Sequence, residues 1–279
     1  MRRGAPVEAE VVLRRGEGKR ARLNGAPLRT PELLRNELPA LVFTPDRLAV
    51  VKGGPAIRRA YLDRAVGRLL PARADLPLRY GEALGQRNAC LRKISAGYST
   101  AQTLAPWTEQ VVSLGASLQV ARAEVLAALS PSLTDTAAAF GLSDCRLEYR
   151  GEPLSADALE KRLPRDIERG TTGQGPHLDE IAILSGARDL RSFGSQGEQR
   201  TAVLALLLAE ATLLVEMTGE PPLLLLDDVL SELDFDRRRM LTELLGKIGQ
   251  TVITATSESA LPLEPDQLVL VRPGTAEAQ

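Results

Sequence analysis

The sequence predicts an α/β fold in which a parallel sheet carries a helical insertion. Residues 223–226 are four leucines, and such a short unbroken apolar run is typical of a strand buried on both faces. A helical pattern at 237–247 and a second apolar run at 251–255 follow. This order, strand, helix, strand, favours parallel strands joined by a right-handed crossover. Between about residues 55 and 130, apolar residues instead recur every three or four positions, which predicts helices.

The amino-terminal part of the chain is predicted to be rich in strands. Residues 7–13 and 19–24 alternate between apolar and polar side chains, as half-buried strands do. Asn24 and Gly25 then favour a tight turn. Residues 39–44 form a further apolar run and are expected to be a buried strand.

A helical insertion is predicted in the middle of the chain. Its first block runs from about Pro55 to Gly97, its second from Ala105 to Leu129, and a third helix is expected after Pro131. In the first block, one face is apolar and the other is basic. The apolar face holds Ala60, Leu62, Ala65, Val66, Leu69 and Leu70, and the basic face holds Arg58, Arg59, Arg64 and Arg68.

Charge is distributed unevenly along the chain. Residues 1–100 carry 20 Lys and Arg against 9 Asp and Glu, although the whole chain has a net charge of −1. A basic half favours a polyanionic partner, because neutralising phosphates releases condensed counterions. The alternative is that these arginines only solvate a helical surface. The candidates for DNA contact are Lys52, Arg58, Arg59, Arg64, Arg68 and Arg87.

Composition favours a soluble protein of a reducing compartment. Cys90 and Cys145 fit no metal or redox spacing, which suits the cytoplasm. The most apolar stretch, Ala202 to Met217, contains two glutamates and is shorter than the ~20 residues that cross a bilayer. We therefore expect a cytoplasmic location and no membrane partner.

Two carboxylates follow the leucine strand directly. A strand of a parallel sheet that ends in Asp227 and Asp228 presents them at the carboxyl edge, where α/β folds bind ligands. Such a pair suits Mg²⁺ beside phosphate oxygens. In this interpretation Asp227 holds Mg²⁺, and Asp228 is catalytic because it positions or deprotonates the attacking water. The alternative is an ordinary strand that ends in a solvated turn.

A short acidic segment comes next, Ser231-Glu232-Leu233-Asp234. It resembles the D-loop of ABC ATPases, a loop that crosses the interface between two subunits, with Ser231 and Asp234 as its candidate residues. Asp234 or Asp236 could also cap the helix that is expected to begin near Arg237. Both roles are compatible.

A third constellation precedes the leucine strand by about 30 residues, Ser195-Gln196-Gly197-Glu198-Gln199-Arg200. Ser195 and Glu198 have the spacing of a capping box, and a helix start with exposed N–H groups can bind an anion. An ordinary capped helix is the alternative. Followed by a leucine strand with two aspartates, the segment resembles the ABC signature, which binds nucleotide held by another subunit. Its candidate residues are Ser195, Gln196, Gly197 and Glu198.

Further segments, in the same order along the chain, resemble the RecF family of bacterial recombination mediators. They are Phe43-Thr44-Pro45-Asp46, Val51-Lys52-Gly53, Arg58-Arg59-x-Tyr61-Leu62-Asp63, Gln86-Arg87-Asn88 and Gly175-Pro176-His177-x-Asp179. A transporter ATPase subunit does not carry the first four. Leu178 and Glu180 stand where the family has arginine and a second aspartate. For His177 a structural and a functional role are equally open.

The resemblance implies an ABC-type ATPase core with a helical lobe. It implies a protein that binds DNA, single-stranded or gapped, together with ATP and Mg²⁺, and that forms an ATP-dependent homodimer. It further implies help in loading recombinase, induction of the SOS response, and RecO- and RecR-type mediators as partners. The expected division is a β-rich remnant of the ATPase lobe at 1–56, a DNA-binding helical lobe at 57–170, and the remaining ATPase part at 171–279.

The sequence contains no G-x-x-x-x-G-K-[ST] segment, the P-loop that cradles nucleotide phosphates. Its two Gly-Lys pairs, at Gly18 and Gly246, lack both the first glycine and the final hydroxyl residue. We therefore expect an N-terminally incomplete core in which ATP and Mg²⁺ binding is weakened or lost, and enzyme activity stays open. The alternative is a non-catalytic DNA-binding or interaction protein on a decayed ABC scaffold.

Overall fold

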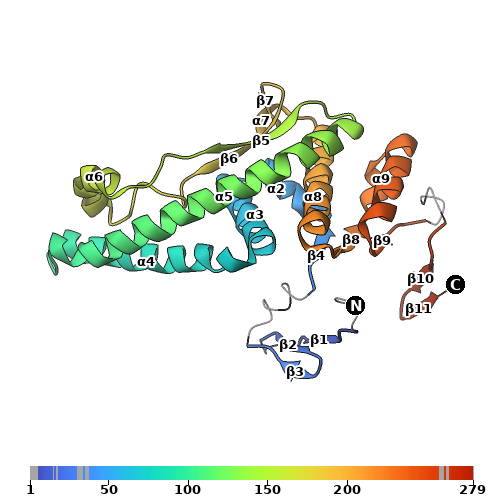
Figure 1. Cartoon of the computed structure of the whole chain (residues 1–279), viewed down its shortest axis with the longest axis horizontal. Coiled ribbons are helices and arrows are strands. Elements are labelled where there is room, and N and C mark those ends of the chain that lie inside the picture. The colour runs from blue at the N-terminus through green and yellow to red at the C-terminus, as the bar shows by residue number, and fades with distance from the viewer. Residues whose placement is uncertain are drawn as a thin grey trace.

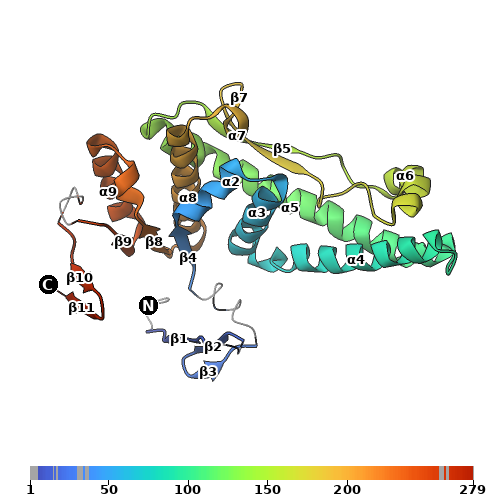
Figure 2. The same cartoon turned by 180° about the vertical axis from the view of Figure 1, so that it is seen from behind.

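The computed structural model describes residues 6–14, 16, 18–29, 34, 38–257, 261 and 264–278. Its body is built around one long helix, α8 (Gln196–Thr218), with a parallel sheet near one end of it. A helical arm extends to one side, and Figures 1 and 2 both place two small sheets, one near each terminus, away from this body.

The predicted parallel sheet is confirmed. It has the order β4 (Ala40–Phe43), β8 (Leu223–Asp227) and β9 (Thr251–Thr254), with β8 in the centre. Both neighbours run parallel to β8. Helix α9 (Phe235–Ile248) makes the connection from β8 to β9, as the strand–helix–strand pattern predicts.

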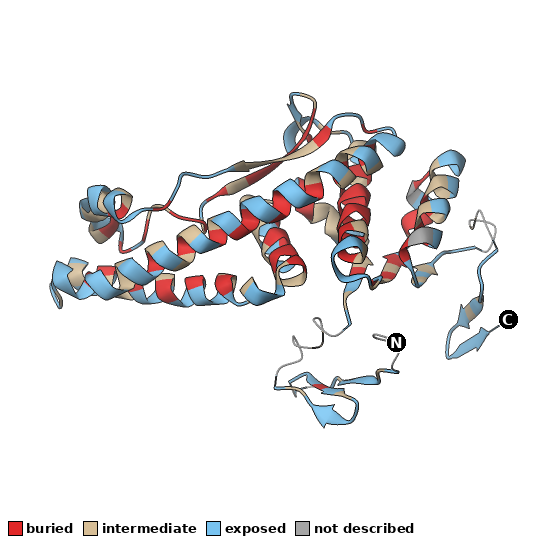
Figure 3. Cartoon of the chain, in the orientation of Figure 1, coloured by how far each residue is buried: buried red, intermediate tan, exposed pale blue. Residues whose placement is uncertain are grey.

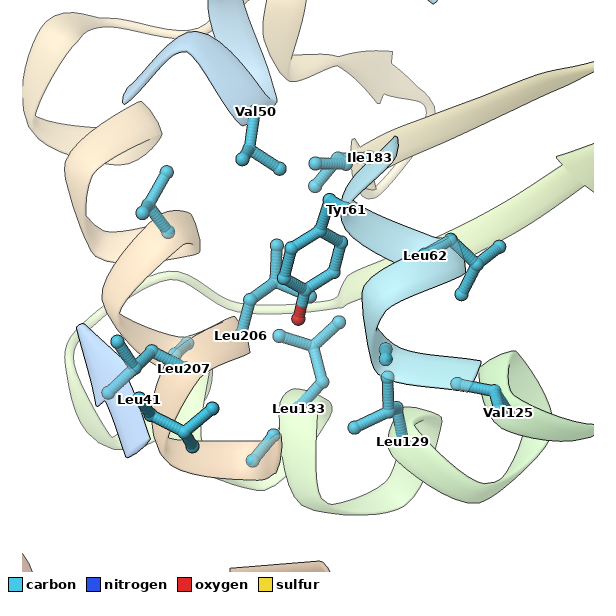
Figure 4. Packing of buried hydrophobic residues seen from close by; sticks show 14 of the residues in the cluster. Leu41, Val50, Tyr61, Leu62, Val125, Leu129, Leu133, Ile183, Leu206 and Leu207 are labelled. Atoms are coloured by element: carbon cyan, nitrogen blue, oxygen red, sulfur yellow. The ribbon is translucent and has the colours of Figure 1, made fainter. Parts of the chain in front are cut away.

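Helix α8 is the core of the molecule. Figure 3 shows the middle of this helix largely buried, whereas residues 196–197 and 216–218 at its two ends are exposed. Leu204, Leu206 and Leu208 are at most 2% exposed. Figure 4 shows how Leu206 and Leu207 meet side chains from β4 and from the helical arm around Tyr61. Fully burying a leucine stabilises a fold by about 1.5–3 kcal/mol, so this helix holds the sheet and the arm together.

The helical arm contains three consecutive helices, α3 (Pro55–Leu69), α4 (Leu76–Ser95) and α5 (Ala105–Ala139). Short turns precede or separate them: η2 (Pro45–Leu48), α2 (Ala49–Lys52), η3 (Pro71–Arg73) and η4 (Ala101–Leu104). The prediction that a separate third helix begins after Pro131 is wrong. Pro131 lies inside α5, because packing of buried residues on both sides of it, among them Leu129 and Leu133, keeps the helix continuous.

A second sheet lies against the arm. Strand β5 (Cys145–Arg150) pairs along its whole length with β6 (Glu180–Ser185), and β7 (Arg188–Asp189) adds a short edge. Helix α6 (Ala156–Arg169) connects β5 to the loop before β6, and α7 (Leu190–Phe193) connects β7 to α8. The sequence patterns described above do not predict these strands. They matter for function because β6 and β7 lead directly to the start of α8.

The terminal sheets are antiparallel. Strands β1 (Ala9–Val12), β2 (Arg20–Leu23) and β3 (Ala26–Pro27) form the first, which confirms the two predicted amino-terminal strands. The predicted turn is also confirmed, with φ of 48° at Asn24 and 77° at Gly25. Strands β10 (Val269–Arg272) and β11 (Thr275–Ala278) form the second.

Two stretches of the described chain, Ala101–Ala139 and Gln196–Thr218, are long and apolar enough to cross a membrane by length and composition alone. The second is longer than the apolar stretch noted in the sequence. In that helix, 72% of the most apolar window is buried inside the structure, as expected of a helix at the centre of a folded core.

Candidate nucleotide and DNA site

The two candidate carboxylates lie at the carboxyl end of the central strand. Asp227 is the last residue of β8 and stands in register with Thr254, the last residue of β9. The hydroxyl of Thr254 donates to Asp227 Oδ1 at 2.6 Å, and it accepts from the backbone N–H of Asp228 at 3.0 Å. Asp227 is exposed at this edge of the sheet, so its second oxygen can serve an incoming ligand.

Asp228 has an unusual backbone. Its φ is +50° and its ψ is +28°, the left-handed region that non-glycine residues seldom adopt. Ser231 lies on the turn η5 (Val229–Glu232), and its hydroxyl donates to the carbonyl of Asp228 at 2.9 Å. The predicted D-loop therefore folds back onto the second carboxylate residue.

Asp234 caps α9, as the alternative interpretation of the acidic segment predicts. Its Oδ1 accepts from the backbone N–H of Arg237 at 2.9 Å. Ser231 and Asp234 are both exposed, so this cap leaves the loop accessible to another molecule.

The signature-like segment begins α8 with the predicted capping box. Ser195 Oγ accepts from the N–H of Glu198 at 3.2 Å, and the Glu198 carboxylate accepts from the N–H of Ser195 at 2.7 Å. These bonds and the guanidinium of Arg188, 2.8 Å away, lower the pKa of Glu198 to about 2. Ser195, Gln196 and Gly197 are exposed, and the first N–H groups of the helix can meet an anion.

The two halves of the candidate nucleotide site do not meet within one chain. Ser195 precedes α8, whereas Asp227 lies beyond its other end, and 23 residues give the helix a length of about 34 Å. Figures 1 and 2 show the same separation, with α7 at one end of α8 and β8 at the other. A nucleotide bound at Asp227 can meet a signature segment only if a second molecule supplies it.

The carboxylate pair fits a hard cation only with help from a ligand. Among the described residues, no group of three His, Cys, Asp or Glu side chains could hold a metal ion. Mg²⁺ is commonly held by one or two carboxylates together with phosphate oxygens and water. The donor set at Asp227 and Asp228 fits that mode of binding.

Two of the six candidate DNA-binding residues are buried. This corrects the prediction that Arg58 lies on an exposed basic face, and it places Arg87, the candidate on the next helix, inside the arm. Arg58 is 4% exposed and Arg87 is 1% exposed. Arg58 donates to Glu180 at 2.7 Å, and Arg87 donates to Asp166 at 3.1 Å and to Thr172. The physical reason is helical spacing: Arg58 lies four residues before Leu62 and Arg87 four before Leu91, so each belongs to the buried stripe of its helix.

The remaining four candidates differ in their environment. Lys52 and Arg64 are exposed. Arg59 is half-buried and donates to the carbonyl of Asp179 at 2.9 Å. Arg68 forms an ion pair with the buried Glu210 of α8, and its Nη2 is buried with no hydrogen-bond partner among the residues that the structure describes. On α3, Arg64 is therefore a surface residue, whereas Arg68 forms an ion pair with the core.

His177 has a structural position. Its Nε2 lies 3.0 Å from the carbonyl of Thr172, so Nε2 carries the proton, and its Nδ1 lies 2.7 Å from the hydroxyl of Tyr80, from which it accepts. Burial lowers the pKa of His177, which keeps the ring neutral. The geometry assigns to this histidine the linking of α4 to the loop before β6.

The other motif residues join the same network. Arg122 of α5 binds Asp63 at 2.8 Å and the carbonyl of Pro176 at 2.6 Å. Asn88 accepts from the backbone N–H of Thr172 at 2.8 Å. Sequence reasoning missed Arg122 because its partners lie more than 50 positions away. The motifs that identify the family thus contact one another inside the helical arm.

Comparison with known proteins gives one consistent result. No protein-family profile matches the chain. Among curated proteins, the chain is similar to the DNA replication and repair protein RecF of Heliobacterium modesticaldum, with 38% identity over 281 residues, 95% of this chain and 74% of the relative. It is also similar to RecF of Geobacter sulfurreducens, with 38% identity over 283 residues, 93% of this chain and 74% of the relative.

Solved structures agree. The recombination mediator protein RecF-ATPrS of the RecFOR pathway superposes with a TM-score of 0.83 and 30% identity, covering 98% of this chain and 76% of that one. RecF-ATP of the same pathway gives 0.82 and 27%, covering 94% and 73%. The predicted ABC-type fold with a helical lobe is confirmed by these similarities.

Proposed function

Because the chain belongs to the RecF family of DNA replication and repair proteins, we propose that it binds gapped or single-stranded DNA together with ATP. The proposed role is recombinational repair in the cytoplasm, with help in loading recombinase and in inducing the SOS response. RecO- and RecR-type mediators are the proposed partners, since the similar solved structures are of the RecFOR pathway. We also propose the division into segments 1–56, 57–170 and 171–279, with DNA bound by the second.

The separation of the signature from the carboxylates along α8 carries the proposal of an ATP-dependent dimer. In the proposed head-to-tail pair, Ser195, Gln196, Gly197 and Glu198 of one copy meet nucleotide held by the other. Ser231 and Asp234 are exposed and lie at the interface. In this proposed arrangement each nucleotide site is completed by residues of both copies.

At the carboxylate edge we propose separate roles for the two aspartates. Asp227 binds Mg²⁺ with the oxygen that Thr254 leaves available, and Asp228 positions or deprotonates the attacking water. Bound Mg²⁺ would neutralise charge that develops on the phosphate oxygens. In water-assisted phosphoryl transfer the protein contributes mainly position and electrostatics.

We propose that this chain does not hydrolyse ATP by itself, because its sequence holds no P-loop segment. The test is a magnesium-dependent ATPase assay on the purified chain and on Asp228→Asn. We expect no turnover above background in either protein. Turnover by the chain that Asp228→Asn abolishes would overturn the proposal.

That absence of a P-loop segment also favours the second candidate, a non-catalytic DNA-binding or interaction protein on a decayed ABC scaffold. The genomic DNA immediately upstream of the codon for Met1 separates the two candidates. An in-frame G-x-x-x-x-G-K-[ST] segment there supports the ATP-dependent protein. A stop codon before any such segment supports the decayed scaffold.

For DNA contact we propose Lys52, Arg59 and Arg64. Arg68 stays a candidate, although its side chain is 13% exposed and paired with Glu210, whereas the buried Arg58 and Arg87 do not. Removing one phosphate-binding side chain should lower the slope of log affinity against log salt by about 0.9 for duplex DNA and about 0.7 for single strands. We therefore expect Lys52→Ala/Arg64→Ala, which removes two such side chains, to lower the slope by about 1.8 on duplex DNA or about 1.4 on single strands. Arg239→Ala, an exposed change on α9, is the control. An unchanged slope in the double variant would remove these residues from the DNA surface.

A further inference from the structure

Two residues from two segments, Thr254 of β9 and Ser231 of η5, hold the peptide units on either side of Asp228. The N–H of Asp228 donates to Thr254 Oγ1 at 3.0 Å, and the C=O of Asp228 accepts from Ser231 Oγ at 2.9 Å. Between these two bonds the residue has φ of +50°. A left-handed conformation is unfavourable for a residue with a side chain, so it persists where the surroundings hold it.

The hydroxyl of Thr254 makes two bonds that need opposite roles. Its single proton is given to Asp227 Oδ1 at 2.6 Å, and its lone pair accepts the N–H of Asp228. The parallel register of β8 and β9 pairs Asp227 with Thr254, which brings one hydroxyl within reach of both aspartates. A side chain without a hydroxyl at this position, such as valine, could make neither bond.

We propose that Thr254 is the positioning residue for both aspartates of the nucleotide site, and that Ser231 completes the hold from the D-loop side. This inference rests on the proposed function, in which Asp227 binds the cation and Asp228 acts on water. Thr254 orients the carboxylate of Asp227 and fixes the left-handed turn that sets the direction of Asp228. Because Ser231 belongs to the proposed subunit interface, a second copy that moves the D-loop would move the peptide of Asp228.

The first measurement needs neither nucleotide nor metal. In the full chain labelled with ¹⁵N-aspartate, hydrogen exchange at the Asp228 amide reports its bond to Thr254. We expect Thr254→Val to speed this exchange at least tenfold and Thr254→Ser, which keeps the hydroxyl, to restore protection. Thr251→Val makes the same change at the other end of β9 and should leave the Asp228 amide unaffected.

The second measurement reports the consequence for a cation. Mn²⁺ broadens the resonances of nearby residues, so titration of the same labelled samples gives the dissociation constant at Asp227 and Asp228. We expect Thr254→Val to raise this constant at least threefold, with Thr254→Ser and Thr251→Val within twofold of the unchanged chain.

The two measurements separate the inference from the function on which it rests. Exchange at Asp228 that is insensitive to Thr254→Val, or not restored by Thr254→Ser, overturns the positioning role whatever Mn²⁺ does. If Mn²⁺ broadens neither aspartate in the unchanged chain, the proposed cation site is wrong, and the exchange data still decide whether Thr254 holds Asp228. Far-ultraviolet circular dichroism of each variant confirms that the fold is kept.

Discussion

Arg87 lies inside the helical arm with its guanidinium against the carboxylate of Asp166 and the hydroxyl of Thr172. Both members of the ion pair are almost completely buried, at 1% and 2% side-chain exposure. Removing one partner of a buried pair leaves an uncompensated charge in a medium that solvates it poorly. The buried ion pair and the bond to Thr172 therefore connect α4 to α6 and to the loop before β6.

We expect Arg87→Ala to lower the free energy of unfolding by about 3 kcal/mol, because it leaves Asp166 buried without its partner. Urea unfolding measures this. The matched control on the same helix is Arg79→Ala. Arg79 lies 3.4 Å from its partner Asp75, and both side chains are exposed. Removing this exposed ion pair should lower the free energy of unfolding by at most about 0.5 kcal/mol. Equal effects of the two changes would contradict a special role for Arg87.

Glu198 gives a pH-dependent prediction. Its pKa is lowered to about 2 by the N–H of Ser195 and by Arg188, so the unfolded chain binds a proton more readily than the folded one. The stabilisation is therefore complete above the ordinary pKa of about 4.3 and is lost as pH falls from there towards 2. Glu198→Gln should lower stability at pH 7 by about 0.5 kcal/mol after allowance for solvent screening.

The difference between Glu198→Gln and the unchanged chain should shrink when urea unfolding is repeated near pH 3. Gln196→Ala, two positions earlier and exposed, controls for a general effect on the start of the helix. A difference that is the same at both pH values would show that the charge of Glu198 does not contribute.

At the scale of elements, local patterns predicted α8, β8, α9 and β9, because a capping box, an apolar run and a helical spacing are all contained in short segments. Strands β5 and β6 escaped prediction, because their pairing joins residues from Cys145 to Ser185 across an intervening helix. The exposed position expected for Arg58 was wrong although its spacing from Leu62 places it on the buried stripe of α3, because an arginine on that stripe needs a partner for its charge. Its partner Glu180 lies 122 positions away, and no local pattern reveals it.

Helix α5 continues through Pro131, although proline cannot donate the bond that would close the preceding turn. Packing of the long helix against α4, α8 and β5 therefore outweighs a local penalty. Pro131 is exposed, so its replacement leaves the core unchanged. We expect Pro131→Ala to raise the free energy of unfolding by about 1–2 kcal/mol, because alanine restores the hydrogen bond and favours helix.

Thermal or urea unfolding of Pro131→Ala checks this, with Ser132→Ala at the next position as the control. An unchanged or lowered stability would mean that the chain around Pro131 has adapted to the missing bond.

At the scale of the whole molecule, one hydrophobic cluster extends from β4 through the helical arm and α8 to α9. The proposed segments 57–170 and 171–279 share it, and the ion pair of Arg58 with Glu180 joins them again. Cooperative unfolding is expected where a single core is shared. The arm and the sheet should therefore unfold together.

Trp107, the only tryptophan of the chain, lies on α5 beside a groove shared with α4 and reports on the arm alone. We expect its fluorescence and the far-ultraviolet circular dichroism to give the same midpoint in urea. Two separated midpoints would show that the helical arm unfolds independently of the ATPase part.

The strand order of the central sheet determines how late in synthesis the sheet can form, because β4 pairs with the distant β8. Strand β4 pairs with β8, and Ala40 faces Leu223, so neighbours in the sheet are separated by roughly 180 positions of chain, the kind of distant pairing that slows folding. During synthesis β4 must wait until β8 has left the ribosome. For much of that time an apolar strand lacks its neighbour and is exposed to wrong pairing. The carboxylates at the edge of this sheet are consequently among the last features of the nascent chain to be assembled.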